Sequence, residues 1–501
     1  MRWRGSPRTF VVMLAAFLSL SLLPSLAGCV AGSSTLEKVM TAIGSDSRPL
    51  SEGAAREMGR FEQVYTTYSE AEAPRDRLDY FRFAFKRVRA NYVHDTNDKS
   101  LIDEAIKGVV EKDPKPAPGD LKPASLVEDA LHAMVASLDP HSSYMNADEF
   151  RESFVQTKGE FGGLGIQVMM EDGLVKVIAP IEDTPAARAG MKSGDLISHV
   201  DGAPIKGKKL GEAVRLMRGP PGSDITLTVL RPAEPAFDVV ITRAVIQVKS
   251  VRWHSEGDIG YVRITRFSEK TEAGLEAAVA SLRTELGSQL RGVVLDLRNN
   301  PGGLLDQSVI VADAFLDEGE IVSVRGRDAE SYRAFAAKTG DLAAGLPLVV
   351  LINAGSASAS EIVAGALKHH HRATLMGATT FGKGSVQTIM PLPVDGALRL
   401  TTALYYTPDG ETIQARGVVP DIRILAEPKG DKDKPRRREK DLPGALPAAG
   451  AGAAASLPTV KQAACPAVGE KKDRPLGCAL AYLRAGSTTK FMATVNSGSQ
   501  S

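Results

Sequence analysis

Ser358 and Lys383 are the two side chains of this sequence best placed to act as a nucleophile and its base. Ser358 lies in the segment NAGSASASE, between an apolar run that predicts a strand and a segment that predicts a helix. A serine at the start of a helix has free backbone N–H groups and the positive end of the helix dipole beside it, which favours negative charge near its hydroxyl oxygen. The histidines at 369–371 lie about 16 Å farther along the same helix. The base predicted by type is therefore Lys383, in the segment TTFGKGSVQ.

Lys383 can accept a proton only when it is neutral. Lowering a lysine pKa from about 10.4 to near 7 costs about 4–5 kcal/mol, which desolvation in a crevice can impose. Phe381 and two glycines flank Lys383, and no acidic residue lies within four positions of it. Gln387 is the candidate that orients Lys383. Four residues of straight strand span about 13 Å, so we expect the chain to bend at Gly384.

Backbone amides complete the predicted site. The candidate donors of an oxyanion hole are Ala359, next to the nucleophile, and Gly302 or Gly303 in the segment LDLRNNPGG. Each of the three segments follows a predicted strand, and loops at the strand ends of an α/β sheet face a common crevice. We therefore expect these loops to converge. Apolar runs at 293–295 and 348–351 are typical of strands buried on both faces, so the region 247–425 is predicted to be an α/β domain.

Two further regions precede this domain. Residues 76–155 show helical spacing of apolar side chains, interrupted by the Pro-rich segment 112–123, and predict a helical cap. Residues 156–246 consist of short β-rich runs with one predicted helix near 210–217, and they resemble a PDZ domain of the permuted bacterial kind. That resemblance implies that the amides around Gly163, Leu164, Gly165 and Ile166 bind a terminal carboxylate. The alternative is that these residues form only a tight turn.

Six short motifs together resemble one protein family. They are DPHSSY, LDLRNNPGG, SASASEI, TFGKGSVQ, LTTALYYTPDG and GVVPDI, in this order between residues 77 and 425. The chain is identified by them as similar to the carboxyl-terminal processing peptidases, also called tail-specific proteases, of peptidase family S41. The resemblance implies an α/β crotonase-like core with an inserted PDZ domain, no metal and no cofactor. It also implies that Ser358 is the nucleophile, Lys383 the general base and Gln387 its support.

Simpler interpretations of the same residues stand beside these. Ser358 and Glu361 fit the S-x-x-E capping box, so Ser358 could serve only as a helix cap. The segment from Gly377 to Lys383 fits the start of a phosphate-binding loop, but Gly384 follows where Ser or Thr is needed, and the next segment predicts a strand. The run 369–371 is most simply a solvated helix end.

The N-terminus predicts export. Three arginines, an apolar stretch and the quartet Leu-Ala-Gly-Cys ending at Cys29 resemble a lipoprotein signal peptide over 1–28, with Cys29 lipidated. A flexible tether over 29–75 is expected to follow. In an oxidising compartment, Cys465 and Cys478 are a candidate disulfide. Residues 426–460 predict a disordered linker, and 461–501 a C-terminal helical segment.

The predicted function is serine endoproteolysis of exported proteins at or near their C-termini, on the periplasmic side of the cell envelope. The expected partners are the C-terminal tails of proteins or peptides. The chain is also expected to bind the membrane through the lipid on Cys29. A net charge of +1 gives no electrostatic footprint for nucleic acid. The sequence leaves open a homo-oligomer or an adaptor. It also leaves open a lipid-anchored PDZ scaffold whose peptidase core is inert or needs a partner.

Overall fold

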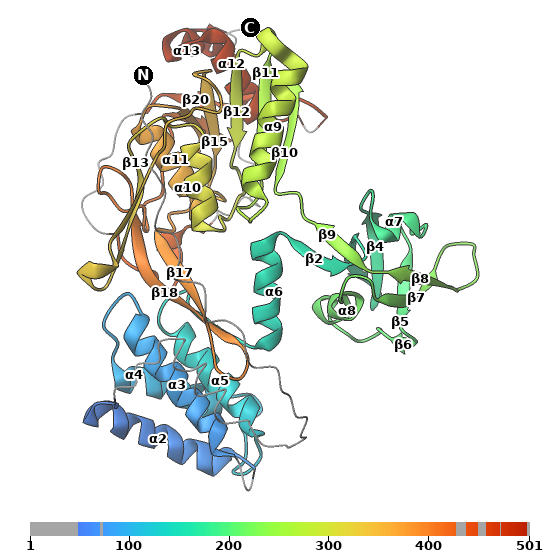
Figure 1. Cartoon of the computed structure of the whole chain (residues 1–501), viewed down its shortest axis with the longest axis vertical. Coiled ribbons are helices and arrows are strands. Elements are labelled where there is room, and N and C mark those ends of the chain that lie inside the picture. Colours follow the sequence, from blue (N-terminus) through green and yellow to red (C-terminus); the bar gives the residue numbers. More distant parts are fainter. Residues whose placement is uncertain (1–48, 71–73, 427–436, 449–456, 471, 498–501) are drawn as a thin grey trace, which may run out of the picture. The chain divides into compact units, whose positions relative to one another are not determined.

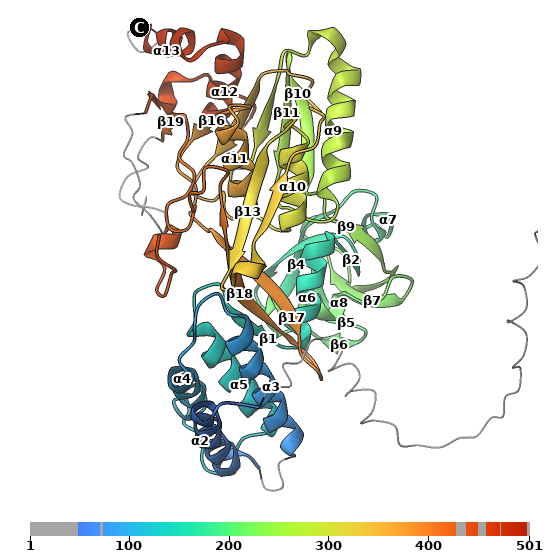
Figure 2. The same ribbon diagram turned by 60° about the vertical axis from the view of Figure 1, so that its left-hand side comes forward.

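The computed structural model describes residues 49–70, 74–426, 437–448, 457–470 and 472–497, and its ribbon is shown in Figure 1 and Figure 2. All described elements belong to one unit, Asp46–Ser501. The predicted signal peptide and Cys29 lie outside the described residues. No helix of the described part is both long and apolar enough to cross a membrane.

A seven-stranded sheet organises the region that carries the candidate site. Its strand order is β10-β11-β12-β15-β16-β19-β20. The strands are β10 (Val251–Glu256), β11 (Ile259–Ile264), β12 (Gly292–Asp296), β15 (Leu348–Ile352), β16 (Thr374–Gly377), β19 (Ile422–Leu425) and β20 (Thr459–Lys461). β10 pairs antiparallel with β11, and all other neighbours are parallel.

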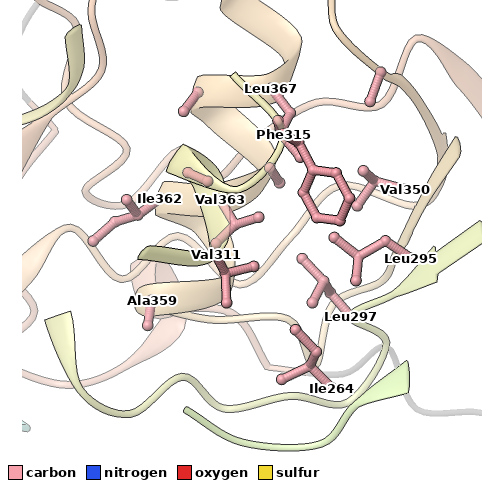
Figure 3. Packing of buried hydrophobic residues seen from close by; sticks show 14 of the residues in the cluster. Ile264, Leu295, Leu297, Val311, Phe315, Val350, Ala359, Ile362, Val363 and Leu367 are labelled. Atoms are coloured by element: carbon pink, nitrogen blue, oxygen red, sulfur yellow. The ribbon is translucent and has the colours of Figure 1, made fainter. Parts of the chain in front are cut away.

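Helices cover both faces of this sheet. One face packs against α9 (Thr271–Leu286), α10 (Leu305–Asp313) and α11 (Ala359–His369), and the other against α12 (Arg474–Ala485) and α13 (Thr488–Ser497). Val293 and Leu295 of β12 point into the first core, and Val294 between them into the second. Figure 3 shows the Phe315 ring beside Leu295 and Val350 in the first core. The α/β domain predicted from the apolar runs is thus present.

A second sheet links this domain to the helices near the N-terminus. It contains β1 (Ser143–Met145), β13 (Glu320–Gly326), β14 (Arg333–Ala336), β17 (Ser385–Pro391) and β18 (Ala397–Tyr406). Leu398 and Leu400 of β18 pack into the core formed by α2 (Glu52–Tyr68), α3 (Arg75–Asn91), α4 (Asp98–Val110) and α5 (Pro123–Ala136). Figure 2 shows the β17–β18 hairpin running toward these helices. The strand that follows Lys383 therefore ends in the helical region.

Two predicted flexible segments are wrong in part. The predicted tether 29–75 contains helix α2, which begins after the capping residue Ser51 and buries Ala54, Met58, Phe61 and Tyr65. The interpretation failed because these four apolar residues are separated by polar ones that occupy the exposed face of the helix. The described residues of the predicted linker 426–460 include a 3-10 turn (Glu439–Asp441), the buried Leu446 and the start of β20. The Lys-, Pro- and Ala-rich composition of the segment shows no periodicity that would have predicted them.

Residues 160–247 form the PDZ-like region. The strands β2 (Glu160–Gly163) and β9 (Ala244–Gln247) form a two-stranded ribbon. Between them in the chain lies a sheet of order β3-β4-β5-β7-β8, with β6 beside β5. These strands are β3 (Ile166–Glu171), β4 (Leu174–Pro180), β5 (Leu196–Val200), β6 (Ala203–Pro204), β7 (Asp224–Leu230) and β8 (Phe237–Thr242), with helices α7 (Pro185–Arg188) and α8 (Leu210–Met217). Helix α6 (Ala147–Lys158) precedes the ribbon.

Candidate active site

Three loops that leave neighbouring parallel strands line one cavity of about 450 Å³. They follow β12, β15 and β16, whose carboxyl ends lie side by side in the sheet. The cavity wall contains Gly302, Gly303, Ser358, Ala359, Lys383 and Gln387. The structure therefore brings together all the residues that the sequence assigned to nucleophile, base, support and oxyanion hole.

Ser358 occupies a strained backbone position at the start of α11. Its φ and ψ are 56° and −118°, a combination that non-glycine residues rarely adopt. Its side chain makes no capping hydrogen bond, and the N–H of Glu361 donates to the Ser358 carbonyl at 2.7 Å. The serines on either side have structural partners, since Ser356 Oγ donates to the Leu297 carbonyl and Ser360 Oγ to that of Asn300. Of the three serines, Ser358 alone is half-buried rather than buried, and it lines the cavity.

Glu361 connects the serine loop to the lysine loop. Its fully buried carboxylate accepts hydrogen bonds from the backbone N–H groups of Ser358 at 2.8 Å, Gly382 at 2.8 Å and Lys383 at 2.9 Å, and from the Thr380 hydroxyl. Burial raises the pKa of Glu361 to about 7, although these hydrogen bonds lower it. The sequence pattern indicates for Glu361 only a role as half of a capping box. No sequence signal revealed that the carboxylate reaches a second loop.

Lys383 has the environment that a neutral lysine needs. Burial lowers its pKa to about 8, while the charge of Glu439 raises it and that of Arg399 lowers it further. Its backbone is fixed on both sides, because the N–H bonds to Glu361 and the carbonyl accepts a hydrogen bond from the hydroxyl of Tyr405. The main chain around Lys383 is therefore anchored by two fully buried side chains.

Gln387 lies one strand residue beyond a register shift in β17. Its Nε2 donates to Ser385 Oγ at 3.0 Å and to Thr401 Oγ1 at 3.1 Å. Within the described residues nothing donates to its Oε1, which is left as a free acceptor in the cavity. The irregularity in the strand falls between Val386 and Gln387. Gly384, where a bend was expected, instead allows a close approach, since a Cβ there would lie 2.5 Å from the Gln414 nitrogen.

The candidate oxyanion donors differ in their availability. The N–H of Gly302 donates to Asn300 Oδ1 at 2.9 Å. Among the residues that the structure describes, no acceptor takes a hydrogen bond from the N–H of Ala359 or Gly303. Gly302 has a different role: a Cβ there would lie 2.9 Å from Ser358 Cβ and 2.8 Å from the Ala357 carbonyl. The glycine thus lets the loop pack directly against the serine.

Tyr405 and Glu439 are parts of the site that the sequence did not reveal. Tyr405 is 1% exposed, lines the cavity, and has its pKa raised well above the usual range by burial. Glu439 is fully buried, pairs with His141 Nε2 at 2.7 Å and accepts a hydrogen bond from Gln414 Nε2 at 2.9 Å. Tyr405 lies in the quoted motif YYTPDG and could have been considered, whereas Glu439 lies in a segment without any pattern.

The four residues proposed to bind a carboxylate lie at the edge of the PDZ-like sheet. Ile166 begins β3, opposite Pro180, and Gly163 ends β2. In the described part of the chain, the N–H groups of Leu164 and Gly165 have no hydrogen-bond acceptor. Gly165 has φ +80°, and a Cβ there would lie 2.3 Å from the Thr184 side chain. The turn therefore needs glycine and also presents two free donors.

The candidate disulfide and one residue of the histidine run 369–371 have structural partners. Cys465 and Cys478 form a disulfide with a Cα–Cα distance of 5.0 Å. His370 Nε2 lies 2.7 Å from the Glu320 carbonyl. Within the described residues, no group of three or more His, Cys, Asp or Glu side chains is arranged to hold a metal ion. Lys383 is followed by strand β17, which is not the helix that a phosphate-binding loop requires.

Two family models and several known proteins match this chain. Residues 258–424 match the model of peptidase family S41, and residues 176–231 match that of the PDZ domain. The carboxy-terminal-processing protease of Bartonella bacilliformis is 50% identical over 374 residues, 74% of this chain and 80% of that protein. A Staphylococcus aureus (strain COL) protein with the name "Probable CtpA-like serine protease" is 38% identical over 298 residues, 59% of each chain. The structure of the photosystem II D1 C-terminal processing protease matches with a TM-score of 0.42 and 30% identity, over 70% of this chain and 93% of that one. The chain therefore belongs to the carboxy-terminal-processing serine proteases of peptidase family S41 and contains a PDZ domain.

Proposed function

We propose that this chain is a serine endopeptidase that cleaves exported proteins at or near their C-termini with a Ser358/Lys383 dyad. The observation that carries the proposal is the shared anchor of the two loops. One buried carboxylate, Glu361, holds the backbone of the serine and of the lysine, and both side chains line the same cavity. Such pre-organisation of reacting groups is what bond cleavage by a nucleophile and a base requires.

In the proposed first step, neutral Lys383 Nζ removes the proton of Ser358 Oγ, which attacks the carbonyl carbon of the scissile peptide bond. The resulting oxyanion is stabilised by the N–H groups of Ala359 and Gly303, which have no other described acceptor. We prefer Gly303 to Gly302, whose N–H already bonds to Asn300. The Lys383 ammonium then gives its proton to the leaving amine, and water hydrolyses the acyl-enzyme with the lysine again as base.

The pKa of Lys383 fits this role. At about 8 it leaves roughly a tenth of the lysine neutral at pH 7, which is about 300-fold more than a lysine with the ordinary pKa of 10.5 would have. The free Oε1 of Gln387 is suited to accept a hydrogen bond from the lysine and to orient it. The Tyr405 hydroxyl also supports Lys383, because it donates a hydrogen bond to the Lys383 backbone carbonyl.

The tail of the substrate is proposed to bind in the PDZ domain. The unpartnered N–H groups of Leu164 and Gly165 are suited to a terminal carboxylate, and the edge of β3, beginning at Ile166, is suited to strand addition. Gly163 completes the turn. We further propose that the core is crotonase-like, and that the chain is exported and lipid-anchored through Cys29 on the periplasmic side of the envelope.

Purified mature protein and an unfolded substrate with an apolar C-terminal tail test the proposal. Ser358→Ala and Lys383→Ala are each expected to lower kcat by about 10⁴-fold or more, and the activity should persist in EDTA. Ser331→Ala and Lys338→Ala, at exposed positions, are matched controls that should retain full activity. Retained turnover by folded Ser358→Ala protein excludes this nucleophile. Tail binding by the wild-type protein without any cleavage favours the scaffold alternative.

A further inference from the structure

Two arginines, Arg266 and Arg399, line the catalytic cavity without a carboxylate partner. Arg266 follows strand β11 and bonds through Nη1 to the neutral Gln156 Oε1 at 3.0 Å. Arg399 lies in β18, and its Nη2 contacts the sulfur of Met145 at 3.5 Å. Neither guanidinium forms an ion pair with any residue in the part of the chain that the structure describes. Both side chains are half-buried.

Another arginine of the same domain shows that a buried guanidinium normally has carboxylate partners. Arg298, at the end of β12, bonds to both Asp296 and Asp473, each at 2.7 Å for the closest contact. Cations removed from water are normally paired in this way, because an unpaired charge is costly to desolvate. Arg266 and Arg399 instead line the same cavity without a carboxylate partner among the described residues.

The two cations are close enough to repel. Burial lowers the pKa of Arg266, and the charge of Arg399 lowers it further. Arg399 also acts on the pKa of Lys383 in the same direction. Two like charges that share one cavity are stabilised when an anion binds between them.

The nearby carboxylates are committed elsewhere. Glu152 pairs with Arg218 and Asp148 with Arg151, while Glu149 caps the start of α6. Glu439 pairs with His141. Asp306 lines the cavity at an exposed position in the first turn of α10 but forms no ion pair with either arginine in the described structure.

The arginines also flank the reacting groups. Arg266 precedes Phe267, whose N–H donates to the Gly302 carbonyl at 3.0 Å, so it borders the proposed oxyanion loop. Arg399 and Thr401 lie on the same face of β18, about 7 Å apart along the strand, and Thr401 accepts a hydrogen bond from Gln387. An anion held by both guanidiniums would therefore lie within the catalytic cavity, in the same domain as Ser358.

We propose that Arg266 and Arg399 form a carboxylate-binding subsite of the catalytic cavity. The subsite holds a carboxylate of the substrate during cleavage, either the free C-terminal carboxylate or an acidic side chain near the scissile bond. Guanidinium groups suit this ligand because they bind carboxylates through paired hydrogen bonds. The inference rests on the proposed function, and it adds a carboxylate site separate from that of the PDZ domain.

Binding to full-length mature Ser358→Ala protein tests the subsite without turnover. The probes are N-acetyl-trialanine with a free carboxylate and the same peptide as its C-terminal amide. Their binding is measured by calorimetric titration. Two carboxylate-dependent sites are expected, one in each domain. In the Arg266→Gln/Arg399→Gln protein, the affinity for the peptide with a free carboxylate should fall about 10- to 100-fold at one site. Its affinity at the second site should stay unchanged. Gly165→Ala, whose Cβ would collide with Thr184, should remove only the second site.

A third probe, N-acetyl-Ala-Ala-Glu-amide, separates the two sources of the carboxylate. Arginine-dependent binding of trialanine acid alone assigns the subsite to the chain terminus, and arginine-dependent binding of the glutamate amide assigns it to an acidic side chain. Arg266→Lys/Arg399→Lys, which keeps the charge without the paired donors, should retain part of the affinity. Equal binding of acid and amide at every site, or unchanged binding to the folded Arg266→Gln/Arg399→Gln protein, overturns the subsite.

A kinetic arm keeps this inference distinct from the proposed function. With Ser358 present, the kcat/KM ratio for acid and amide forms of a short cleavable peptide should fall in the Arg266→Gln/Arg399→Gln protein. If the binding result holds and no variant or wild-type protein cleaves, the proposed function fails and the subsite stands. If cleavage occurs, but neither the acid-to-amide ratio of kcat/KM nor the binding of the acid depends on the two arginines, the proposed function stands and the subsite fails.

Discussion

Ser358 and Lys383 are held by the same atom, since Oε2 of Glu361 accepts the backbone N–H of Ser358 at 2.8 Å and that of Lys383 at 2.9 Å. The two residues are 25 positions apart in the chain and leave different strands. Their relative position therefore depends on a buried carboxylate that touches neither the hydroxyl nor the ammonium group in any described hydrogen bond.

Removing the charge of this anchor should impair catalysis more than substrate binding. Glu361→Gln keeps the side-chain volume but replaces one accepting oxygen with a donor, so at least one loop loses its contact. Displacement of a reacting group by about 1 Å costs about 100-fold in rate. We expect kcat to fall by about that factor with little change in KM, measured by steady-state kinetics on a peptide substrate.

Glu149→Gln is the matched control for that change. Glu149 caps helix α6 in the same way, through the N–H of Asn146 at 3.1 Å, but does not reach a second loop. Its loss should lower the free energy of unfolding by about 1 kcal/mol or less and leave kcat unchanged. Equal losses of kcat in the two variants would show that Glu361 acts only as a cap.

The pH dependence of activity should follow the charges around Lys383. Because only neutral lysine is a base, kcat/KM should rise with pH and level off above the lysine pKa, near pH 8. Glu439 raises this pKa and Arg399 lowers it. Glu439→Gln should therefore move the rising limb to lower pH, and Arg399→Gln to higher pH. Shifts in the same direction in both variants would contradict this account of the lysine environment.

The buried ammonium should also destabilise the fold. The pKa of Lys383 is about 8 in the folded chain and 10.5 as its ordinary value, so the destabilisation is complete below pH 8 and disappears as the pH rises to about 10.5. Lys383→Met should raise the free energy of unfolding by about 3 kcal/mol at pH 7. Denaturant titrations at pH 7 and pH 10 measure the difference, and a gain that does not shrink at pH 10 speaks against a desolvated cation.

Gly302→Ala should lower activity by a steric route. The new Cβ would lie 2.9 Å from Ser358 Cβ, at a φ of +99°, so the loop and the serine must move apart. We expect a loss of kcat of about 100-fold or more together with a lower melting temperature. Gly340→Ala is the control, because Gly340 has a φ of +142° but nothing lies within 4 Å of its Cβ position. It should lower stability through strain and leave kcat unchanged.

The amino-acid sequence alone was sufficient to predict the main strands of the α/β domain and the side chains of the candidate site. Uninterrupted apolar runs such as 348–351 identified strands covered on both faces, because such strands have no solvent-facing position. The strand-then-loop order around Gly302, Ser358 and Lys383 was enough to predict that the loops meet, since parallel strands place their carboxyl ends at one edge. Those inferences depend on local pattern and on sheet topology, both of which are encoded in short stretches of chain.

The tertiary structure decided which atoms are engaged and which are free. Only the packed loops show that the N–H of Gly302 is taken by Asn300 while that of Gly303 has no described acceptor. Burial sets the pKa of the lysine, Glu439 and Arg399 shift it from distant parts of the chain, and the Tyr405 hydroxyl bonds to the Lys383 carbonyl. A pKa and a free donor depend on what surrounds a group in three dimensions, and residues that lie tens or hundreds of positions apart leave no periodic signal of that proximity.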